Sequence, residues 1–326
     1  MPAQARAVTH VAPRRVEVRD VALPAPGPDE VVVRVEASGL SAGTERLVFT
    51  GQLEPDEPLD ASLPGLAAGL AYPLRYGYCA VGVVEAVGHE QLAPWRGRRV
   101  FAFAPHQSHL VVPAASLVPL PDVPAEVATA LANLETAVSL VMDGAPLLGE
   151  ACGVVGLGVV GHLVASLLGR LGLGAVLAVD PRGDRRDALA GAGVERLDGP
   201  RRDACDVVFE VSGSLAGLGS ALELARADGR VVVGSWYGKD ARPLALGTRV
   251  HRARQTVRFS QVSRIAPALA GRFDKARRLR VAVDWLTRLD LSRLVTHRVP
   301  AERAAEAFEL LLSPPPGCLH TVLTWG

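Results

Sequence analysis

Apolar and polar residues alternate in short runs over the first third of the chain, a pattern typical of β-strands with one buried face. Many of the apolar residues are β-branched, and turns rich in proline and glycine separate the runs. Strands are therefore predicted at residues 6–11, 14–21, 30–40, 79–87 and 98–104. The segment 51–73 contains four prolines and has weak periodicity, which predicts a long surface loop or a lid.

From about Pro124 the pattern changes to short apolar strands that alternate with segments of helical spacing. Such alternation predicts βαβ units and a parallel sheet. After residue 260 come arginine-rich helical stretches, a helix opened by Pro300 and a last strand. The order predicts an α/β protein with a β-rich domain at 1–124 and 268–326, and a doubly wound domain at 125–267.

The length of 326 residues fits two domains, and the charge is nearly balanced, with 35 Lys+Arg against 34 Asp+Glu. This balance argues against a surface for nucleic acid or anionic membranes, which needs a basic excess. Aromatic residues make up only 5% of the chain, so a stacking platform for single-stranded nucleic acid is not expected. We therefore expect a small-molecule substrate, with no nucleic-acid or membrane partner.

The four cysteines are too far apart in sequence for a C-x-x-C pair: Cys79, Cys152, Cys205 and Cys318. Free thiols in a reducing compartment fit this spacing better than a disulfide scaffold does. The first 20 residues contain no apolar segment of a secretory signal. The uncharged stretch 151–169 is interrupted by glycines, which makes it a poor membrane helix. A cytoplasmic protein is expected.

A glycine motif follows one of the predicted strands, because Gly156, Gly158 and Gly161 form G-x-G-x-x-G directly before a helix-forming run. The first glycine permits a tight turn, the second lets a pyrophosphate approach the backbone, and the third lets the helix pack closely on the strand. The helix start, with Val159 and Val160, offers unpaired N–H groups to the phosphates. This context predicts a dinucleotide site, and a glycine-rich turn needed only for packing is the alternative.

Asp180 closes the next strand, 19 residues after Gly161, where an acid that binds the adenosine ribose belongs. Its carboxylate would accept hydrogen bonds from the ribose hydroxyls and repel a 2′-phosphate, which favours NAD(H) over NADP(H). Three arginines follow, which either bind a 2′-phosphate or form a solvated helix start: Arg182, Arg185 and Arg186. Further cofactor contacts, or ordinary turns, are expected at the ends of two later strands, at Ser212, Gly213, Ser214, Gly234, Ser235 and Trp236.

Three segments match the motifs of a known enzyme superfamily. SGLSAGTE at 38–45 resembles an S-G-x-C-x-[ST]-D turn, and YGYCAVGVVEAVG at 76–88 resembles a G-H-E-x-x-G-x-V-x-x-V-G strand. LETAVSL at 134–140 resembles the helix that leads to the nucleotide strand. Over essentially its whole length the chain resembles the medium-chain dehydrogenase/reductase superfamily, nearest the branch of bacteriochlorophyllide hydroxyethyl dehydrogenases. The resemblance implies a GroES-like catalytic domain, a Rossmann domain, an NAD(P)-dependent enzyme and a homodimer.

Zinc-dependent members of this superfamily bind their catalytic metal through Cys, His, and Cys or Glu. Residue by residue, the cysteine corresponds to Ser41 or Ala42, the histidine to Tyr78 and the third ligand to Ala132. Glu135 lies three residues further on, but one carboxylate does not make a zinc site, which needs three protein ligands. The four-cysteine structural lobe of the family is also missing from the sequence. The resemblance therefore implies a member without zinc.

Without a Lewis acid, protein donors must polarise the oxygen of a carbonyl or enone while hydride moves. Tyr78 is the first candidate donor, and a tyrosine with only a packing role is the alternative. Ser41 and Thr44 could relay a proton, although turn capping would explain both residues. Glu45 takes the place of a family acid whose role is usually structural, which leaves a catalytic role as the other interpretation.

Two more candidates for acid–base chemistry come from outside these motifs. Glu135 lies on an apolar helix, where burial without a partner would be costly, so it is either an ion-pair anchor or a general base with a raised pKa. His106 and His109 lie near a strand that borders the cleft in relatives, and they are either acid–base groups or loop residues.

These features predict a zinc-independent NAD(P)(H)-dependent oxidoreductase. It would interconvert an alcohol and a ketone, or reduce an activated C=C bond, in a small to medium organic substrate. Two alternatives stay open. One is a redox-neutral isomerase, lyase or cyclase that oxidises and re-reduces a single substrate, and the other is a dinucleotide-binding protein without turnover.

Overall fold

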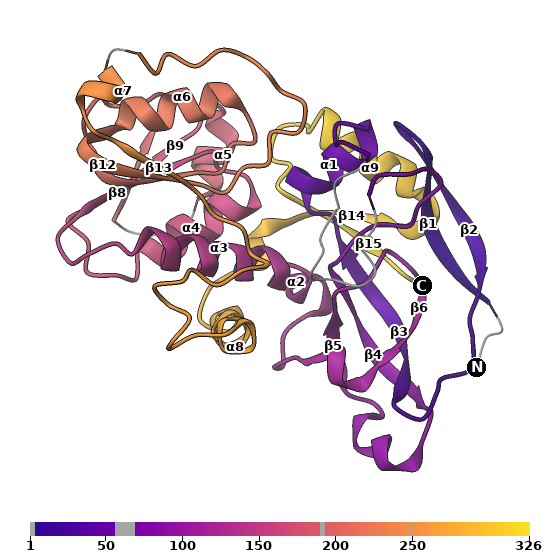
Figure 1. Cartoon of the computed structure of the whole chain (residues 1–326). Coiled ribbons are helices and arrows are strands. Elements are labelled where there is room, and N and C mark those ends of the chain that lie inside the picture. The colour runs from indigo at the N-terminus through magenta and orange to yellow at the C-terminus, as the bar shows by residue number, and fades with distance from the viewer. Residues whose placement is uncertain (1–3, 56–68, 190–192, 248) are drawn as a thin grey trace. The chain divides into compact units, whose positions relative to one another are not determined.

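A computed structural model describes residues 4–55, 69–189, 193–247 and 249–326 of the chain. The chain divides into two compact units, one made of Met1–Ala132 with Leu286–Gly326 and the other of Asn133–Trp285 (Figure 1). Residues 56–68, which form most of the predicted loop or lid at 51–73, lie outside the described residues.

The first unit consists mainly of β-strands, as the alternating pattern predicts. Its strands are β1 (Gln4–Ala12), β2 (Arg15–Ala22), β3 (Glu30–Gly39), β4 (Ala80–Val87), β5 (Arg99–Ala102), β6 (His109–Pro113), β7 (Val118–Pro119), β14 (Val295–Pro300) and β15 (His320–Thr324). Its helices are α1 (Ala42–Thr50), α2 (Ala125–Ala128) and α9 (Ala304–Leu312), with the 3-10 helices η2 (Glu90–Trp95), η3 (Ala114–Ser116), η4 (Ser292–Leu294) and η5 (Ala301–Arg303).

A seven-stranded sheet organises this unit in the order β14-β15-β3-β4-β5-β7, and β6 also pairs with β3. Strands β1 and β2 form a separate antiparallel pair. The core between the sheet and α9 includes Val33, Phe49 and Phe308. Because Ser38 of β3 pairs with Ala80 of β4, the residues that follow β3 and those that precede β4 lie at the same end of the sheet.

The second unit alternates strands and helices, as its apolar pattern predicts. Its strands are β8 (Ala151–Val155), β9 (Ala175–Val179), β10 (Val194–Leu197), β11 (Cys205–Glu210), β12 (Ala225–Val233) and β13 (Thr256–Phe259). Its helices are α4 (Val159–Leu168), α5 (Gly183–Ala188), α6 (Leu215–Leu224), α7 (Arg249–Arg252) and α8 (Lys275–Leu286). Helix α3 (Leu131–Gly144) leads into it from the first unit.

All strands of the second unit run parallel in the order β10-β9-β8-β11-β12-β13. In this doubly wound order the chain winds outward in both directions from β8, so the topological switch point lies between β8 and β11. The predicted parallel sheet is confirmed. Both edge strands were missed, because β10 carries no fully buried residue and all four residues of β13 are exposed, so neither forms an apolar run.

The units also differ from the domain boundaries expected at 124/125 and 267/268. Residues 268–285 belong to the second unit, where Arg278 of α8 pairs with Glu135 of α3. Residues 125–132 belong to the first unit, where α2 packs against β3 and β4.

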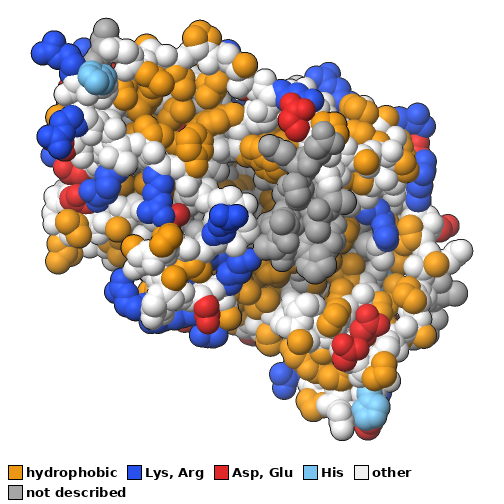
Figure 2. Space-filling view, in the orientation of Figure 1, with side chains coloured by type: hydrophobic (Ala, Val, Ile, Leu, Met, Phe, Trp, Pro, Cys, Tyr) orange, Lys and Arg blue, Asp and Glu red, His pale blue; other side chains and the backbone are white. Residues whose placement is uncertain are grey.

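A buried apolar helical stretch, the surface charges and the cysteines bear on the expected partners and compartment. The helical stretch Ala125–Gly144 has the length and hydropathy of a membrane span, yet 72% of it is buried inside the protein, as in the core helix of a globular fold. On the face shown in Figure 2, Lys and Arg side chains are scattered among apolar and acidic ones. The four cysteines are buried free thiols, and burial raises the pKa of Cys152 and of Cys205 to about 12.

Candidate cofactor and catalytic sites

The glycine motif forms the turn between β8 and α4, and each glycine has the geometry predicted for it. Gly156 has a φ of 95°, and a Cβ there would lie 2.5 Å from Cα of Ser212. Gly161 lies so close to the strand end that its Cβ would be 1.9 Å from the carbonyl oxygen of Gly156. A Cβ on Gly158 would meet nothing within 4 Å, so the turn is open on that side to an incoming group.

Helix α4 begins directly behind this opening, with Gly158 as its N-cap residue. Among the described residues no side chain caps this end, so N–H groups of the first turn, including those of Val159 and Val160, lack an intrahelical acceptor. Unpaired N–H groups and the positive end of the helix dipole favour an anion. The residues present therefore fit the pyrophosphate of a dinucleotide.

Asp180 follows β9 and hydrogen-bonds to the same turn. Its Oδ2 accepts the N–H of Leu157, inside the glycine motif, at 2.7 Å, and its Oδ1 accepts the N–H of Arg182 at 2.9 Å. The residue is 4% exposed. An ionised carboxylate has about four acceptor positions, so two remain for the hydroxyls of a ribose.

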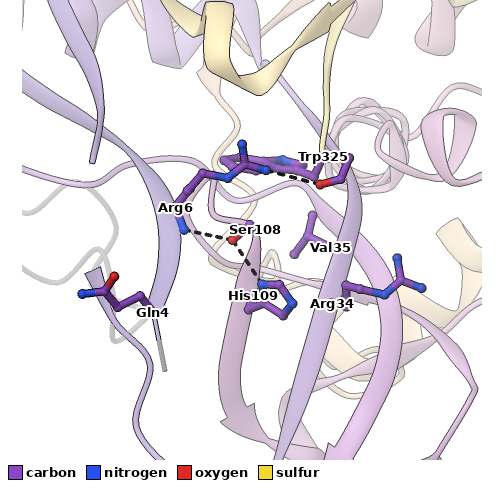
Figure 3. Close-up of a pocket in the computed structure, with 8 residues that line it drawn as sticks. Gln4, Arg6, Arg34, Val35, Ser108, His109 and Trp325 are labelled. Atoms are coloured by element: carbon purple, nitrogen blue, oxygen red, sulfur yellow. Dashed lines mark hydrogen bonds between the residues drawn. The ribbon is translucent and has the colours of Figure 1, made fainter. Parts of the chain in front are cut away.

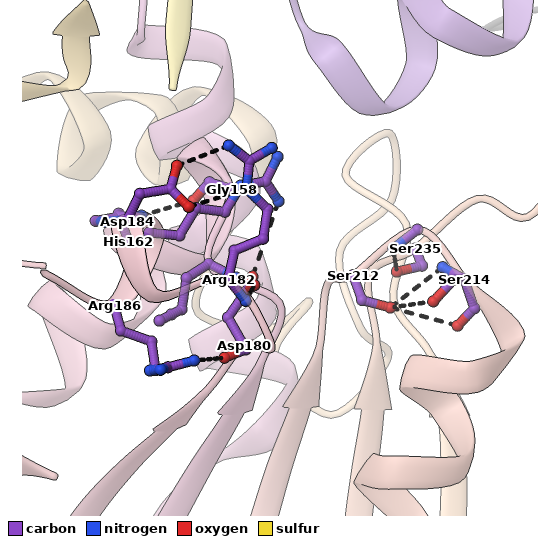
Figure 4. Close-up of polar contacts among 12 residues, drawn as sticks. Gly158, His162, Asp180, Arg182, Asp184, Arg186, Ser212, Ser214 and Ser235 are labelled. Atoms are coloured by element: carbon purple, nitrogen blue, oxygen red, sulfur yellow. Dashed lines mark hydrogen bonds and ion pairs between the residues drawn. The ribbon is translucent and has the colours of Figure 1, made fainter. Parts of the chain in front are cut away.

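Two of the three arginines after Asp180 hydrogen-bond acceptors inside the protein, and the third forms a looser ion pair. Arg182 binds both carboxylate oxygens of Asp184, with Nε and Nη2 at 3.1 and 2.7 Å (Figure 4). Nη1 of Arg186 donates to the main-chain oxygen of Asp180 at 2.6 Å. Arg185 has the loosest contact, with Nη1 3.8 Å from Oδ2 of Asp180, and its buried Nε lacks a partner among the described residues.

The loops that follow β11 and β12 are joined by their own hydrogen bonds. The N–H of Gly213 donates to Oγ of Ser235 at 2.8 Å, and the N–H of Ser214 donates to Oγ of Ser212 at 3.1 Å (Figure 4). The N–H of Ser212 donates to the side chain of Glu210. Because these N–H groups are satisfied, cofactor contacts there would use carbonyl oxygens or hydroxyls. Trp236 comes next and is 38% exposed.

Two buried residues, one at the end of β11 and one beside the glycine turn, were not among the predicted site residues. Glu210 ends β11 and is 0% exposed, and the sequence signal for it was an acid at the end of an apolar strand. His162, in α4, has Nδ1 3.0 Å from the carbonyl oxygen of Gly158, and burial lowers its pKa. In the sequence, the feature that could have indicated His162 was its place directly after the last glycine of the motif.

In the first unit, Tyr78 lies with Ser41 and Thr44. Ser41 is the N-cap residue of α1 and Thr44 lies in its first turn, so these residues start a helix where the sequence predicted a turn. Tyr78 lies two residues before β4, at the same end of the sheet. The Tyr78 side chain hydrogen-bonds with the side chains of Ser41 and Thr44. The structure thus brings three of the predicted catalytic residues together.

The surroundings of Tyr78 keep its hydroxyl protonated. Burial raises its pKa well above the usual value, and the nearby Cys79 and Glu45 raise that pKa further. The two hydrogen bonds with Ser41 and Thr44 lower it only in part. Tyr78 is therefore a neutral hydroxyl donor at physiological pH.

Glu45 and His106 form a buried pair behind the start of α1. Nε2 of His106 is 2.8 Å from Oε2 of Glu45, its Nδ1 is 2.9 Å from Oγ of Ser38, and both side chains are 0% exposed. Oε1 of Glu45 accepts the N–H of Ser41 at 2.8 Å. Gly77, with a φ of 123°, leaves room for the ring, since a Cβ there would lie 2.7 Å from it. These contacts fix Ser41 from the protein interior.

The positions that correspond to zinc ligands carry a hydroxyl, a phenol and a methyl group, at Ser41, Tyr78 and Ala132. Ser41 and Tyr78 hydrogen-bond with one another. Within the described part of the chain, no three or more His, Cys, Asp or Glu side chains are grouped so that they could hold a metal ion. This set of donors does not fit a zinc ion.

Glu135 lies in the second unit, where it forms a buried ion pair with Arg278. Nε and Nη2 of Arg278 are 3.1 and 2.9 Å from Oε1 of Glu135. The guanidinium also donates to Oγ of Ser139 and to the carbonyl oxygen of Arg264. Burial raises the pKa of Glu135, and Arg278 offsets this rise in part. The contacts are those of the ion-pair anchor, one of the two predicted roles.

A separate cavity of about 160 Å³ lies in the first unit and is lined by Gln4, Arg6, Arg34, Val35, Ser108, His109, Trp325 and Gly326 (Figure 3). Oγ of Ser108 accepts the N–H of Arg6 at 2.9 Å and lies 3.1 Å from Nδ1 of His109. The cavity is smaller than a typical site for an organic ligand. Of the histidines considered from the sequence, it contains His109 and not His106.

A doubly wound parallel sheet with an open glycine turn at its switch point, joined to a GroES-like β-rich unit, defines a nicotinamide-dependent dehydrogenase. No family profile matches the chain. The chain is 30% identical, over 96% of both proteins, to the 2-desacetyl-2-hydroxyethyl bacteriochlorophyllide A dehydrogenase of Cereibacter sphaeroides.

Solved structures with the same fold include an alcohol dehydrogenase from Escherichia coli CFT073 complexed with NADH, with a TM-score of 0.76 and 17% identity over 99% of this chain and 100% of that one. A structure from Sinorhizobium meliloti 1021, described as a zinc-binding dehydrogenase and bound to NADP, has a TM-score of 0.76 and 18% identity over the same shares. The chain belongs to the medium-chain dehydrogenase/reductase superfamily, in the bacteriochlorophyllide hydroxyethyl dehydrogenase branch, and it is an NAD(P)-dependent enzyme. The predicted superfamily, branch and fold class are confirmed.

Proposed function

We propose that the protein is a zinc-independent oxidoreductase that interconverts an alcohol and a ketone, or reduces an activated C=C bond, in a small to medium organic substrate. The observation that carries the proposal is the hydrogen-bonded group of Tyr78, Ser41 and Thr44, in which Tyr78 and Ser41 correspond to two zinc ligands of zinc-dependent relatives. Three hydroxyl groups can polarise an oxygen and move a proton, the two tasks that a bound zinc ion otherwise assists.

In this mechanism Tyr78 donates its O–H to the reacting oxygen, and the raised pKa keeps that proton in place until charge develops on the oxygen. A proton from solvent would then reach the Tyr78 oxygen through the hydroxyls of the partly exposed Thr44 and of Ser41, each of which passes on its own proton and accepts another. Glu45 and His106 position Ser41. The nicotinamide cofactor, when bound, supplies or accepts the hydride.

The N-terminus of α4 and Gly158 would hold the pyrophosphate, and Asp180 would hold the adenosine ribose. We propose that NAD(H) is preferred over NADP(H). Asp180 presents a nearly buried carboxylate, and Arg182 and Arg186 already bind protein acceptors, which leaves fewer donors for a 2′-phosphate. Calorimetric titration with NADH and NADPH tests this preference, and tighter binding of NADPH would contradict it.

Of the two proposed reactions, the interconversion of an alcohol and a ketone is favoured over the reduction of a C=C bond. The relative from Cereibacter sphaeroides is named for a substrate with a hydroxyethyl group, which supports an alcohol and ketone pair over a C=C bond. Within this proposal the enzyme acts in the cytoplasm without a nucleic-acid or membrane partner, in keeping with its balanced charge and free thiols.

The protein is proposed to form a homodimer through the edge of its parallel sheet. Strand β13 is an edge strand, and its Val257 and Phe259 side chains are 38% and 66% exposed. Edge strands with exposed apolar residues are ready to pair with another chain. Sedimentation of the wild type beside Phe259→Lys tests this arrangement.

Elemental analysis of the purified enzyme, followed by stopped-flow absorbance of NADH with candidate alcohols and ketones, tests the function. The proposal expects sub-stoichiometric zinc and net conversion of one cofactor per substrate. Stoichiometric zinc would contradict it. Transient cofactor reduction without net consumption would instead identify the redox-neutral isomerase, lyase or cyclase.

A further inference from the structure

Glu210 holds a buried carboxylate at the carboxyl end of β11, next to the switch point of the parallel sheet. Its Oε1 accepts the N–H of Ser212 at 2.8 Å and the hydroxyl of the same serine at 2.5 Å. Its Oε2 accepts the hydroxyl of Tyr237 at 2.6 Å. One oxygen therefore binds the loop after β11, and the other binds the loop after β12.

Two more hydrogen bonds close this connection into a ring. Gly213, the neighbour of Ser212, donates its N–H to Oγ of Ser235 at 2.8 Å. Ser235 also hydrogen-bonds the side chain of Tyr237. The ring runs from Glu210 through the first loop to Ser235, then through Tyr237 back to the carboxylate, so the distance between the two loops is fixed by side chains.

The partners of the Glu210 carboxylate among the described residues are hydroxyl and N–H groups. A buried carboxylate without a cation is costly unless hydrogen bonds compensate its lost hydration. Burial of Tyr237 raises its pKa well above the usual value, and the adjacent Glu210 raises that pKa further, which keeps the Tyr237 hydroxyl protonated. Glu210, Ser212, Ser235 and Tyr237 thus form a hydrogen-bonded brace between the two loops.

We propose that Glu210 and Tyr237 position the nicotinamide half of the cofactor site, an inference that rests on the proposed function. Loops at the carboxyl ends of parallel strands beside the switch point line the cofactor crevice. Glu210 is 0% exposed and acts on the cofactor only through these loops, so it is a positioning residue. Without the brace, the β11 and β12 loops lose their fixed separation, and the ordering that the brace supplies must be achieved during binding.

The adenosine half provides an internal reference, because its residues belong to different strands. The glycine turn and Asp180 follow β8 and β9 and are connected to each other by the bond from Leu157 to Asp180. Loss of the brace is therefore expected to weaken a ligand that carries the nicotinamide ribose, and to leave a ligand that contains only adenosine monophosphate unaffected.

The test is calorimetric titration of Glu210→Gln and Tyr237→Phe with NADH and, separately, with AMP. Glu223→Gln is the matched control, since Glu223 is an exposed acid of α6 in the same unit, paired with Arg202. Removal of one hydrogen bond to a charged group predicts about tenfold weaker NADH binding for both variants, with AMP binding unchanged. The control should bind both ligands as the wild type does.

Unchanged NADH affinity in Tyr237→Phe, or equal weakening of NADH and AMP, would overturn the positioning role. Tyr237→Phe removes a single hydroxyl, and its retained AMP binding reports a folded unit, so the test stands even where Glu210→Gln fails to fold. Absence of NADH binding in the wild type would overturn the proposed function, which is a different result from either of these.

Discussion

Nε2 of His106 lies 2.8 Å from Oε2 of Glu45, and the other oxygen of Glu45 accepts the N–H of Ser41. Both side chains of the pair are fully buried. The indole N–H of Trp325 donates to Oγ of Ser38, which also contacts Nδ1 of His106. A buried series of polar contacts therefore connects Trp325, the residue after β15, to the start of α1, where Ser41 and Thr44 are located.

The first prediction concerns the stability that this chain supplies. Glu45→Ala leaves Nε2 of His106 and the N–H of Ser41 buried without their acceptor, which should lower the free energy of unfolding by about 2–4 kcal/mol. Glu45→Gln keeps an acceptor of the same shape and should cost clearly less. Urea denaturation of both variants measures the difference. Equal losses would contradict this prediction, because Gln keeps both the volume and an acceptor oxygen, and the carboxylate is the only feature that both variants lack.

The second prediction concerns the reacting oxygen. Tyr78→Phe removes the proposed donor and should lower kcat by about 10²–10³-fold, while the Kd for NADH stays unchanged. Tyr72→Phe is the matched control, because the Tyr72 hydroxyl donates to the carbonyl of Val48 and has no proposed role in chemistry. Steady-state kinetics of both variants provides the measurement, and a Tyr78→Phe enzyme with the wild-type kcat would refute the donor role.

The third prediction follows from a histidine beside the buried pair. Burial lowers the pKa of His10 to about 4, and both of its ring nitrogens lack a hydrogen-bond partner among the described residues. Glu45 raises this pKa in part and His106 lowers it. Since the folded-state pKa lies below the unfolded value of about 6.5, the neutral folded form is stable above pH 6.5 and loses stability as the pH falls towards 4.

For His10 alone this loss amounts to about 3 kcal/mol at its limit. His10→Leu, which keeps an apolar contact with Phe49 and Phe308, should therefore reduce the fall in unfolding free energy between pH 7 and pH 4.5. Burial also lowers the pKa of His320 to about 4, so the His10→Leu variant should retain the part of the pH dependence that His320 contributes. Chemical denaturation at several pH values gives the slope of unfolding free energy against pH for the wild type and for His10→Leu. Identical slopes would contradict the role given to His10.

The fourth prediction tests Glu135 as an ion-pair anchor. Arg278→Met leaves a buried carboxylate without its cation and should destabilise the second unit by about 3–5 kcal/mol. The double variant Glu135→Leu with Arg278→Met removes both charges and should recover most of that loss. Thermal unfolding of the single and double variants measures the loss of stability and its recovery. A double variant as unstable as Arg278→Met would mean that the carboxylate has another role.

Much of this fold could be predicted from the sequence because most of its strands bury at least one face. The glycine motif was recognisable for a different physical reason, since the positive φ of Gly156 and the contact of Gly161 with a carbonyl oxygen exclude side chains. The edge strands β10 and β13 could not be predicted, because strands without a buried face carry no periodic apolar signal.

The side-chain partners of the site depended on contacts between distant segments. Glu45 and His106 are separated by 61 positions, and Glu135 and Arg278 by 143, so no local pattern pairs them. The sequence therefore suggested possible roles for Glu45 and Glu135 but did not identify His106 and Arg278 as their partners. Glu210 was missed because a single acid at the end of an apolar strand resembles an ordinary strand terminus.

The central claim is that a pyrophosphate binds at the start of α4, beside Gly158. Gly158→Asp tests it most directly: a Cβ there meets no atom within 4 Å, and Asp is a favoured N-cap residue, so the variant should fold. Its carboxylate would occupy the anion site and repel the phosphates. Gly219→Asp, on α6 and equally free of contacts, is the control. We predict about a hundredfold weaker NADH binding for Gly158→Asp alone, and wild-type affinity in a folded Gly158→Asp sample would contradict the claim.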